Sequence, residues 1–227
     1  MQKKTVSWLA PLSLCAALFM SGQAWAEGSQ KSGEGHKGHS HTHDHSHGHD
    51  NEIYKGYFKD SQVADRALSD WAGDWQSVYS YLKDGTLDPV FAHKAEHGEK
   101  SAKEYRDYYE TGYRTDVERI VIEGDKISFY KDGKAQSGRY VSDGHEILTY
   151  AKGNRGVRFI FKKVDGDEAA PAFIQFSDHR IAPDKSDHYH LYAGNDRAAL
   201  LKEVTNWPTY YPASLKGKDI AHEMMHH

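Results

Sequence analysis

Cysteine is nearly absent from this 227-residue chain. The one cysteine, Cys15, falls in an N-terminal segment that we expect to be removed, so the rest of the chain has no thiol. That part can form no disulfide, and it offers no thiolate to a metal ion. A transition-metal site would therefore be built from His, Asp and Glu side chains, which suit zinc, copper or nickel better than a cluster cofactor.

Long apolar runs are absent after the first 26 residues. Within those residues, Lys3 and Lys4 precede an apolar run over residues 8–20, and residues 24–26 form a small-x-small cleavage site, Ala-Trp-Ala. The run is shorter than the roughly 20 residues that span a bilayer. We therefore expect a cleaved secretory signal peptide at residues 1–26, export to the periplasm and no membrane anchor. A retained anchor is the alternative.

An excess of positive charge is also lacking. Without Lys3 and Lys4, the 29 basic residues fall to 27 against 33 acidic ones, a net charge of −6 with histidine neutral. Nucleic-acid phosphates attract basic surfaces, so this balance argues against a nucleic-acid partner. Histidine, in contrast, is abundant, because the chain has 16 and all of them follow residue 26.

The segment at residues 27–51 is polar and contains no aromatic or aliphatic side chain. It cannot bury enough apolar area to offset its ordering entropy, so we expect it to be disordered. Its imidazoles could gather around one ion at a weak, adaptable site, although a solubilising spacer or a purification tag would have a similar composition. The candidate accessory ligands in this segment are His36, His39, His41, His43, His45, His47 and His49.

Residues 52–227 are expected to form one folded domain. Apolar residues three and four apart predict a helix over residues 60–85, and Ser101 with Glu104 predicts a capped helix over residues 101–113. Short β-branched or aromatic runs then recur about every ten residues, which is typical of an antiparallel barrel or sandwich. The runs cover residues 116–124, 126–133, 138–144, 145–154, 156–166, 172–179 and 188–195. Further helices are predicted at residues 196–207 and 218–227.

Three histidines near the end of this meander are the strongest candidates for a metal site. His188 and His190 are two residues apart, so in a strand they point to the same face. His179 ends the preceding run and comes close to them if the two runs are hairpin neighbours. Three neutral imidazoles with an open fourth position are a known zinc arrangement, and Asp178 and Asp187 could orient the rings by accepting hydrogen bonds. The alternative is an ordinary barrel wall with polar residues.

The C-terminal sequence HEMMH matches H-E-x-x-H, in which two histidines hold zinc and the glutamate is a general base. Because a terminal turn frays, we do not expect a metalloprotease here. The side chains are either accessory metal donors or a solvated tail. The residues concerned are His222, Glu223, His226 and His227. The remaining histidines, His93, His97 and His145, are expected on the surface.

Four separate blocks carry a family likeness. They are LSDWAGDWQSVYSYLKDGTLDPVF at residues 68–91, GVRFIF at 156–161, IQFSDHRIAPDKSDHYHLYAGND at 174–196 and NWPTYYP at 206–212. In this order they resemble the ZinT/YodA family of bacterial periplasmic zinc-trafficking proteins, from residue 61 to the C-terminus.

The resemblance implies a mainly β fold, a lipocalin- or calycin-like antiparallel β-barrel with flanking α-helices. It also implies a zinc site near one barrel mouth, held by His179, His188 and His190, with a variable fourth ligand. Family members bind Zn(II) and Cd(II) and are thought to pass zinc to the periplasmic binding protein of a zinc ABC importer; Cu(II) and Ni(II) share the imidazole donors.

We therefore expect a non-enzymatic, periplasmic protein that captures zinc under limitation or stress. Two alternatives remain open. One is a three-His zinc hydrolase or hydrase, for which the sequence singles out no general base. The other is a lipocalin-like carrier of a small apolar ligand, in which the histidines would be incidental.

Overall fold

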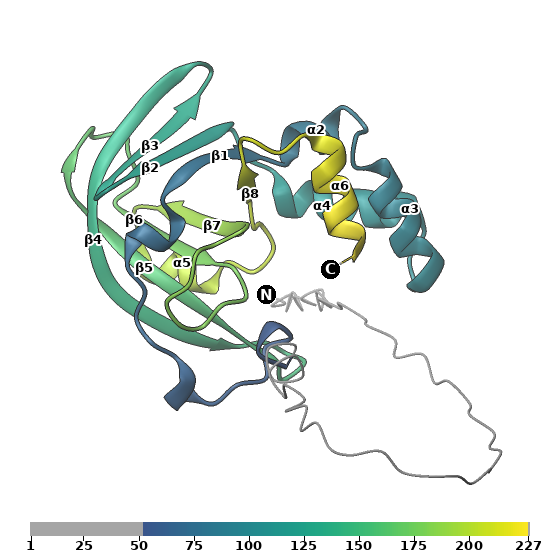
Figure 1. Ribbon diagram of the computed structural model, residues 1–227, viewed down its shortest axis with the longest axis horizontal. Helices are drawn as coiled ribbons and strands as arrows, with labels where there is room; N and C mark the ends of the chain where they lie inside the picture. The colour runs from purple at the N-terminus through teal and green to yellow at the C-terminus, as the bar shows by residue number, and fades with distance from the viewer. Residues whose placement is uncertain (1–51, 227) are drawn as a thin grey trace, which may run out of the picture. The chain divides into compact units, whose positions relative to one another are not determined.

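Eight strands close into an antiparallel barrel in the computed structural model, which describes residues 52–226. Strands that are neighbours in the ring are neighbours in the sequence, and β1 closes the ring by pairing with β8 (Figure 1). The predicted mainly β barrel is thus confirmed. The predicted signal peptide at 1–26, the histidine-rich segment at 27–51 and His227 lie outside the described residues.

The strands are β1 (Gly73–Ser77), β2 (Arg119–Glu123), β3 (Lys126–Lys131), β4 (Lys134–Thr149), β5 (Arg155–Gly166), β6 (Phe173–Ser177), β7 (Tyr189–Gly194) and β8 (Thr209–Pro212).

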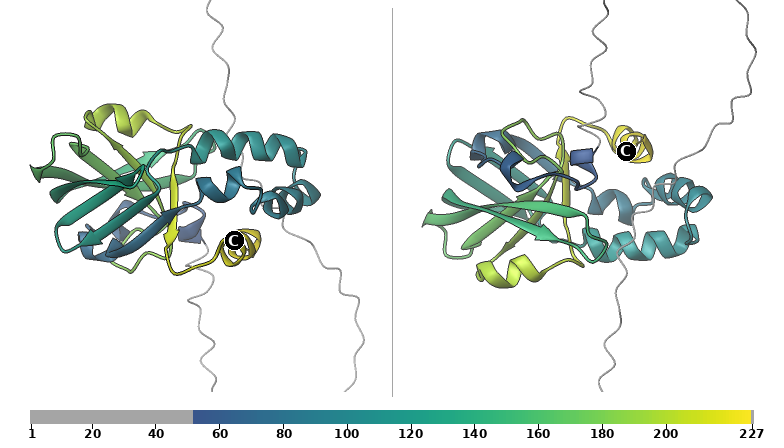
Figure 2. Two further views of the ribbon diagram at one scale, coloured as in Figure 1. Left: turned by 90° about the horizontal axis from the view of Figure 1, so that it is seen from above. Right: turned by 90° about the horizontal axis from the view of Figure 1, so that it is seen from below.

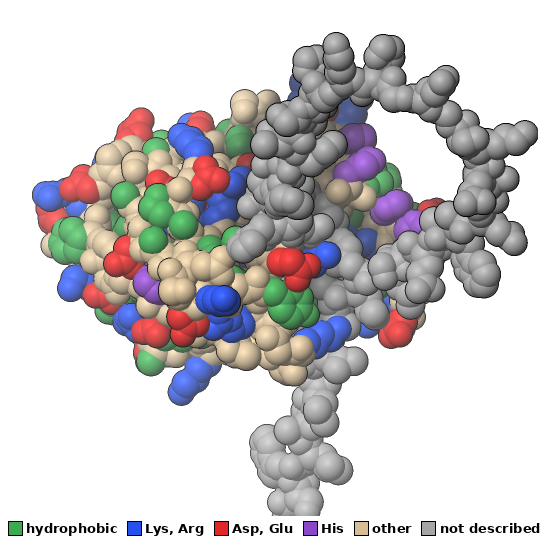
Figure 3. Space-filling model, turned by 60° about the horizontal axis from the view of Figure 1, so that its bottom comes forward, with side chains coloured by type: hydrophobic (Ala, Val, Ile, Leu, Met, Phe, Trp, Pro, Cys, Tyr) green, Lys and Arg blue, Asp and Glu red, His purple; other side chains and the backbone are tan. Residues whose placement is uncertain are grey.

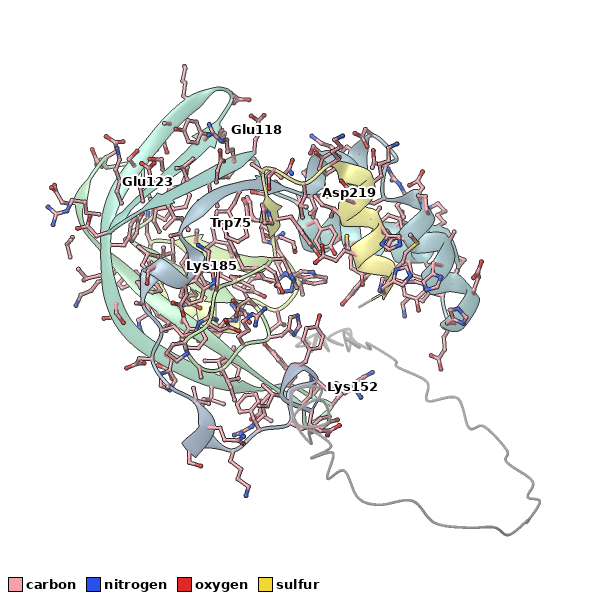
Figure 4. All side chains as sticks on the ribbon, in the orientation of Figure 1. Trp75, Glu118, Glu123, Lys152, Lys185 and Asp219 are labelled. Atoms are coloured by element: carbon pink, nitrogen blue, oxygen red, sulfur yellow. The ribbon has the colours of Figure 1, made fainter. Side chains whose placement is uncertain are left out.

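The barrel interior forms one apolar core, to which every strand contributes a buried side chain. Side chains alternate between the two faces of a strand. In β1, Trp75 is therefore buried inside the ring, where Figure 4 labels it, while the neighbouring Asp74 is exposed. Trp71 stacks on Phe176 with ring centroids 4.6 Å apart. Burying each such side chain stabilises the fold by roughly 1.5–3 kcal/mol.

Four helices form a second apolar core beside β1 and β8, on one side of the barrel (Figures 1 and 2). They pack around Tyr211 of β8. The four are α2 (Tyr79–Lys83), α3 (Asp88–His97), α4 (Ala102–Tyr113) and α6 (Gly217–His226). The remaining helix, α5 (Arg197–Lys202), contacts β6 and β7 instead. No helix within residues 52–226 has both the length and the apolar character needed to cross a membrane.

The helix predicted at residues 60–85 is wrong. This segment contains two 3-10 turns, Asp60–Gln62 and Leu68–Trp71, followed by β1 and α2. The apolar spacing of three and four arises because each short element contributes one or two packed side chains. The chain leaves the second turn through Gly73 at φ +149° and then pairs on both edges as β1. Barrel closure thus overrides a helical pattern.

Other predictions are right in type but not in extent. α4 begins at its predicted capping box, in which Ser101 and Glu104 bond each other's backbone N–H groups, and α6 forms at the predicted place. The runs at 138–144 and 145–154 are one strand, β4, bent at two register shifts. α5 ends five residues early, at Lys202. α3 and the four-residue strand β8 were not predicted, although Pro89 near the start of α3 is a helix-start signal.

Replacing Gly112 by alanine tests the close approach of α4 to the segment that leads into β8. A Cβ at this position would lie 2.3 Å from the Trp207 ring, and Trp207 N donates a hydrogen bond to Gly112 O at 2.6 Å. We expect Gly112→Ala to lower the free energy of unfolding by about 1–3 kcal/mol, because the ring must shift. Urea unfolding measures the change. Thr111→Ala, an exposed neighbour on α4, is the control and should change it by about 0.5 kcal/mol or less.

Candidate metal centre

The loop between β6 and β7, which Lys185 marks in Figure 4, brings His179, His188 and His190 together. Each offers a ligand atom within 4.8 Å of the other two. Their ring centroids are 5.9 Å (179–188), 5.7 Å (179–190) and 6.1 Å (188–190) apart. With Zn–N bonds of about 2.0–2.1 Å, three rings around a tetrahedral ion would have centroids about 5.2 Å apart. The trio therefore needs to close by less than about 1 Å to hold such an ion.

The three rings lie outside the barrel interior, at a seam between the two cores. Tyr189 and Leu191 of β7 point into the barrel core, so His188 and His190 point outward. His188 is only 6% exposed and stacks on Tyr211 of the helical core, with centroids 5.1 Å apart and planes 12° apart. The loop itself is at one end of the barrel.

Register fixes the orientation of His190. It faces Thr209 across the β7–β8 pair, and its Nδ1 lies 2.8 Å from Thr209 Oγ1. The Thr209 hydroxyl donates its single proton to Trp207 O at 2.9 Å. It must therefore accept from His190, which places the ring proton on Nδ1 and leaves the Nε2 lone pair available to a metal.

His188 is oriented by a carboxylate. Its Nδ1 lies 3.1 Å from Asp187 Oδ1, and Arg180 Nη2 donates to Asp187 Oδ2 at 2.9 Å. The hydrogen bond from His188, with the charge of Arg180, holds the pKa of the Asp187 carboxyl well below its usual range. An ionised carboxylate accepts hydrogen bonds, so Nδ1 of His188 is the donor and Nε2 again carries the lone pair.

The environment also keeps His190 uncharged. Burial lowers the pKa of His190 well below its ordinary value of 6.5, and the nearby His179, His188 and Arg158 lower it further. A neutral imidazole is the form that ligates a metal. At neutral pH the Nε2 atom of this ring therefore carries no proton that must leave before an ion binds.

His179 reaches the site through an unusual backbone conformation. Its φ is +65°, in the left-handed region, which L-residues other than glycine and asparagine seldom adopt and which costs of the order of 1 kcal/mol. The ring stacks on Tyr54, with centroids 4.5 Å apart and planes 23° apart. This turn carries the exposed His179 side chain back over His188 and His190.

A buried arginine holds the loop in place. Arg66 is 2% exposed, and its Nη1 donates to Asp178 Oδ1 at 2.6 Å, directly before His179. Its Nη2 donates to Asp184 O at 2.6 Å, and its Nε to Asp70 Oδ2 at 2.9 Å. The face of the guanidinium lies 4.0 Å from the centroid of the Trp71 ring.

Asp70 extends this anchor along the loop. Its Oδ2 accepts from Asp184 N at 3.1 Å, and its backbone oxygen accepts from Ser186 N at 2.9 Å. The loop is therefore fixed at Asp178, directly before His179, and at Asp184 and Ser186, shortly before His188. Its conformation depends on residues that precede β1, more than a hundred positions earlier in the sequence.

The family model described as "ZinT (YodA) periplasmic lipocalin-like zinc-recruitment" matches residues 49–227. The chain belongs to the ZinT family. Among ZinT relatives, the "Probable metal-binding protein YrpE" of Bacillus subtilis is 64% identical over 177 residues, which cover 78% of this chain and 70% of YrpE. The "Zinc-binding protein AdcA" of Streptococcus pyogenes serotype M1 is 53% identical over 180 residues, 77% of this chain but 35% of AdcA.

A solved structure shows the same ZinT fold. The crystal structure of the Zn(II)-bound ZinT-like domain of Streptococcus pneumoniae AdcA matches with a TM-score of 0.74 and 48% identity, covering 76% of this chain and 97% of that domain. The Zn(II)-bound structure of the whole S. pneumoniae AdcA also matches with a TM-score of 0.74, but this chain covers 38% of it. This chain therefore spans about a third of the AdcA proteins that it matches.

The other residues named from the sequence differ in how close they lie to the three histidines of the candidate site. Asp178 bonds Arg66 rather than an imidazole, whereas Asp187 lies beside His188. On α6, His222 and His226 stack on each other with centroids 4.3 Å apart and are not part of the three-histidine group. Glu223 lies closer, within electrostatic reach of Tyr54 and Tyr211, the two rings that stack on the trio. His145 pairs with Asp65, away from the site.

Sequence reasoning missed four residues that shape the site: Arg66, Tyr54, Thr209 and Tyr211. Thr209 and Tyr211 lie in the NWPTYYP block, but only the β7–β8 register shows that they face the histidines. Nothing local in the sequence marks Arg66 or Tyr54, because both act through contacts that are distant along the chain.

Arg66→Met tests the anchor of the loop. It would leave the buried Asp178 carboxylate without its counter-ion; Oδ2 of Asp178 already has no hydrogen-bond partner among residues 52–226. We expect a loss of about 3–5 kcal/mol in the free energy of unfolding, measured by denaturant titration. Adding Asp178→Asn should recover part of the loss.

The control is Arg119→Met, which breaks the exposed pair of Arg119 with Asp74, at 2.7 and 2.6 Å. Water and salt screen an exposed pair, so this variant should leave the unfolding midpoint nearly unchanged. Equal effects of Arg66→Met and Arg119→Met would contradict an anchoring role for Arg66.

Proposed function

We propose that this protein captures Zn(II) outside the cytoplasmic membrane, with His179, His188 and His190 as its ligands. The observation that carries the proposal is the orientation of the His188 and His190 rings. Asp187 and Thr209 lie at the Nδ1 atoms of His188 and His190, so Nε2 is the nitrogen of each ring that would bind the ion. The Zn(II)-bound AdcA domain of the same fold supports zinc as the cargo, although Cd(II), Cu(II) and Ni(II) can use the same donors.

The proposed site suits transient binding. Three protein ligands leave the fourth tetrahedral position open to water or to an incoming ligand, unlike the four protein ligands of a structural zinc site. His179 is exposed, so an exchanging ligand can approach from its side. Glu223 of α6 is a candidate for the open position, because it lies within electrostatic reach of Tyr54 and Tyr211.

We also propose that the histidine-rich segment at residues 27–51 feeds this site. Tyr54, which stacks on His179, follows the last histidine of the segment, His49, by five residues. Five residues span at most about 18 Å, so a metal held near His49 stays close to the trio. Tethering raises the effective concentration of a weak donor without any new contact.

For the recipient of the metal, we propose the binding protein of a zinc ABC importer. AdcA carries the ZinT-like domain together with a larger share of further chain, and it is named a zinc-binding protein. In AdcA the ZinT-like domain is therefore joined covalently to other polypeptide. Export through a leader at residues 1–26 and release without an anchor are part of the same proposal.

The two alternative functions have less support. A hydrolase needs a general base beside the metal. The carboxylates next to the trio are engaged, Asp187 with Arg180 and Asp178 with Arg66. An apolar-ligand carrier needs a ligand cavity. A cleft of about 950 Å³ does lie at the opposite end of the barrel from the β6–β7 loop, but charged Arg114, Lys131 and Asp116 contribute to its lining.

Zinc stoichiometry and affinity, measured by competition with a chromogenic chelator, test the proposed ligands. Three proteins are compared: the chain from residue 27, the same chain without residues 27–50, and the chain with His179→Ala, His188→Ala and His190→Ala. We expect the truncated protein to keep one tight zinc and the triple variant to lose it, with an affinity loss of at least about 100-fold.

The control for that experiment is His145→Ala, which removes an imidazole that pairs with Asp65 and lies in no metal-binding group among the described residues. It should bind zinc as the parent does. The opposite pattern, in which truncation removes the tightest zinc and the triple variant keeps it, would place capture in the histidine-rich segment and leave the trio as barrel wall.

The pH dependence of zinc affinity tests the state of His190. Protons compete with zinc for imidazole, so affinity should fall as the pH drops below about 6.5. Because the pKa of His190 is lowered, this ring is already unprotonated there and releases no proton when zinc binds. The slope of log affinity against pH should therefore be at most two in the protein without residues 27–50. A slope of three would contradict the lowered pKa, and a slope of zero would exclude imidazole ligands.

A further inference from the structure

A second group of metal donors lies on α3. His93 and His97 are four residues apart and Glu96 is three from His93, so all three project from one face of the helix. Their ligand atoms lie within 4.8 Å of one another, and the two rings have centroids 5.1 Å apart with planes 73° apart. This spacing is as close as that of the trio on the barrel.

Within residues 52–226, the contacts of these side chains with one another are a ring contact and a weak ion pair. The side chains of His93 and Glu96 are 41% and 69% exposed, so they are not core residues. His93 Nδ1 is 4.0 Å from Glu96 Oε2, which is too long for a hydrogen bond. Two imidazoles and a carboxylate thus converge without saturating each other.

We propose that His93, Glu96 and His97 form a second binding site for a divalent cation of the zinc class. Ligand atoms on a tetrahedral zinc ion lie about 3.3 Å apart, so His93 and Glu96 need to approach by roughly 0.7 Å, which side-chain rotation supplies. The site covers the last turn of α3, where the helix macrodipole favours a cation, and the ion would neutralise Glu96 there.

This site is open to water and therefore exchanges its metal faster than the trio. Its donors are partly or fully exposed, and His97 is the last residue of α3. Metal binding must therefore restrict the rotation of these side chains, which costs entropy. α3 packs against α6, and α6 carries Glu223 near the rings that stack on the trio. The α3 site thus lies one helix away from the barrel site, but it binds metal whether or not the barrel site does.

The histidine pair of α6 does not form an equivalent site. Histidine side chains gather over the helical side of the molecule in Figure 3, and α3 and α6 both carry exposed ones. On α6, however, His222 and His226 stack nearly parallel at 4.3 Å, and His226 Nδ1 donates to His222 O at 2.7 Å. No third donor joins them among residues 52–226. In the α3 group, Glu96 lies three residues after His93, so its carboxylate shares the helix face of the two histidines.

The order His-x-x-Glu-His on α3 also matches a metallopeptidase motif. A peptidase needs that helix inside a substrate cleft. Here the three side chains face solvent, and the cleft of about 950 Å³ is lined by other elements, including β3, β7 and α5. The geometry supports binding and exchange of the ion, not peptide hydrolysis.

The test maps zinc protection of every imidazole in the full chain. Zinc chloride is titrated into the protein, each sample is pulsed with diethyl pyrocarbonate, and peptide mass spectrometry measures modification at each histidine. His93 and His97 should become protected together, with one midpoint zinc concentration. That concentration should be higher than the one that protects His188 and His190. Glu96→Gln should raise the midpoint of His93 and His97 about tenfold and leave the others unchanged.

Glu99→Gln is the matched control, because it removes a neighbouring exposed carboxylate that is not in the group. It should shift neither midpoint. The proposal is overturned if His93 and His97 stay unprotected up to millimolar zinc, if their midpoints differ, or if Glu96→Gln and Glu99→Gln act alike. The barrel histidines are read in the same samples, so unprotected His188 and His190 would refute the barrel site separately.

Discussion

The candidate metal centre depends on one buried guanidinium. The loop between β6 and β7 has no regular secondary structure, yet it must place an imidazole at each of its ends. Arg66 fixes it by bonding Asp178, Asp184 and Asp70, and Asp70 bonds the loop backbone in turn. A buried charge that loses its partner is strongly destabilising, so the carboxylates of Asp178 and Asp70 are held where the arginine can reach them. Loop geometry is thereby built from electrostatics together with the packing of Ile181 in the barrel core.

Because the candidate site lies between the two cores, an ion bound there would also link them. His188 stacks on Tyr211 of the helical core, while Tyr189 beside it belongs to the barrel core. His190 is linked through Thr209 to Trp207, which packs on α4. An ion held by these rings would cross-link elements from both cores. Metal binding to the native state alone adds to its stability by mass action, so barrel and helices would unfold less independently when loaded.

Much of the fold follows from local patterns, because β-branched runs with alternating faces and regular turns favour a barrel. The segment before β1 shows the limit of such patterns. Its apolar residues recur every three and four positions, as in a helix. In the barrel, however, Trp75 and Asp74 point to opposite faces of β1. Only the pairing of β1 with β2 and β8 decides between helix and strand. Closure is a long-range property, and no window of sequence contains it.

The same division applies to the candidate site. The i, i+2 spacing of His188 and His190 and the proximity of His179 can be read from the sequence, because a strand and a hairpin impose them. The supports cannot: Thr209 and Arg66 act through register and through a contact spanning 112 residues. His93 and His97 were assigned to the surface, and in the structure His97 is exposed and His93 is partly exposed. Their convergence with Glu96 was missed because α3 itself was not predicted.

The left-handed backbone of His179 has a cost that the rest of the loop sustains. Glycine would adopt φ +65° without steric strain, but it would lose the stacking on Tyr54 and more backbone entropy on folding. The chain keeps an imidazole there, and Tyr54 supports its ring. Backbone strain at this position is therefore set against the placement of a metal-binding side chain. A glycine here would relieve the strain and remove that donor.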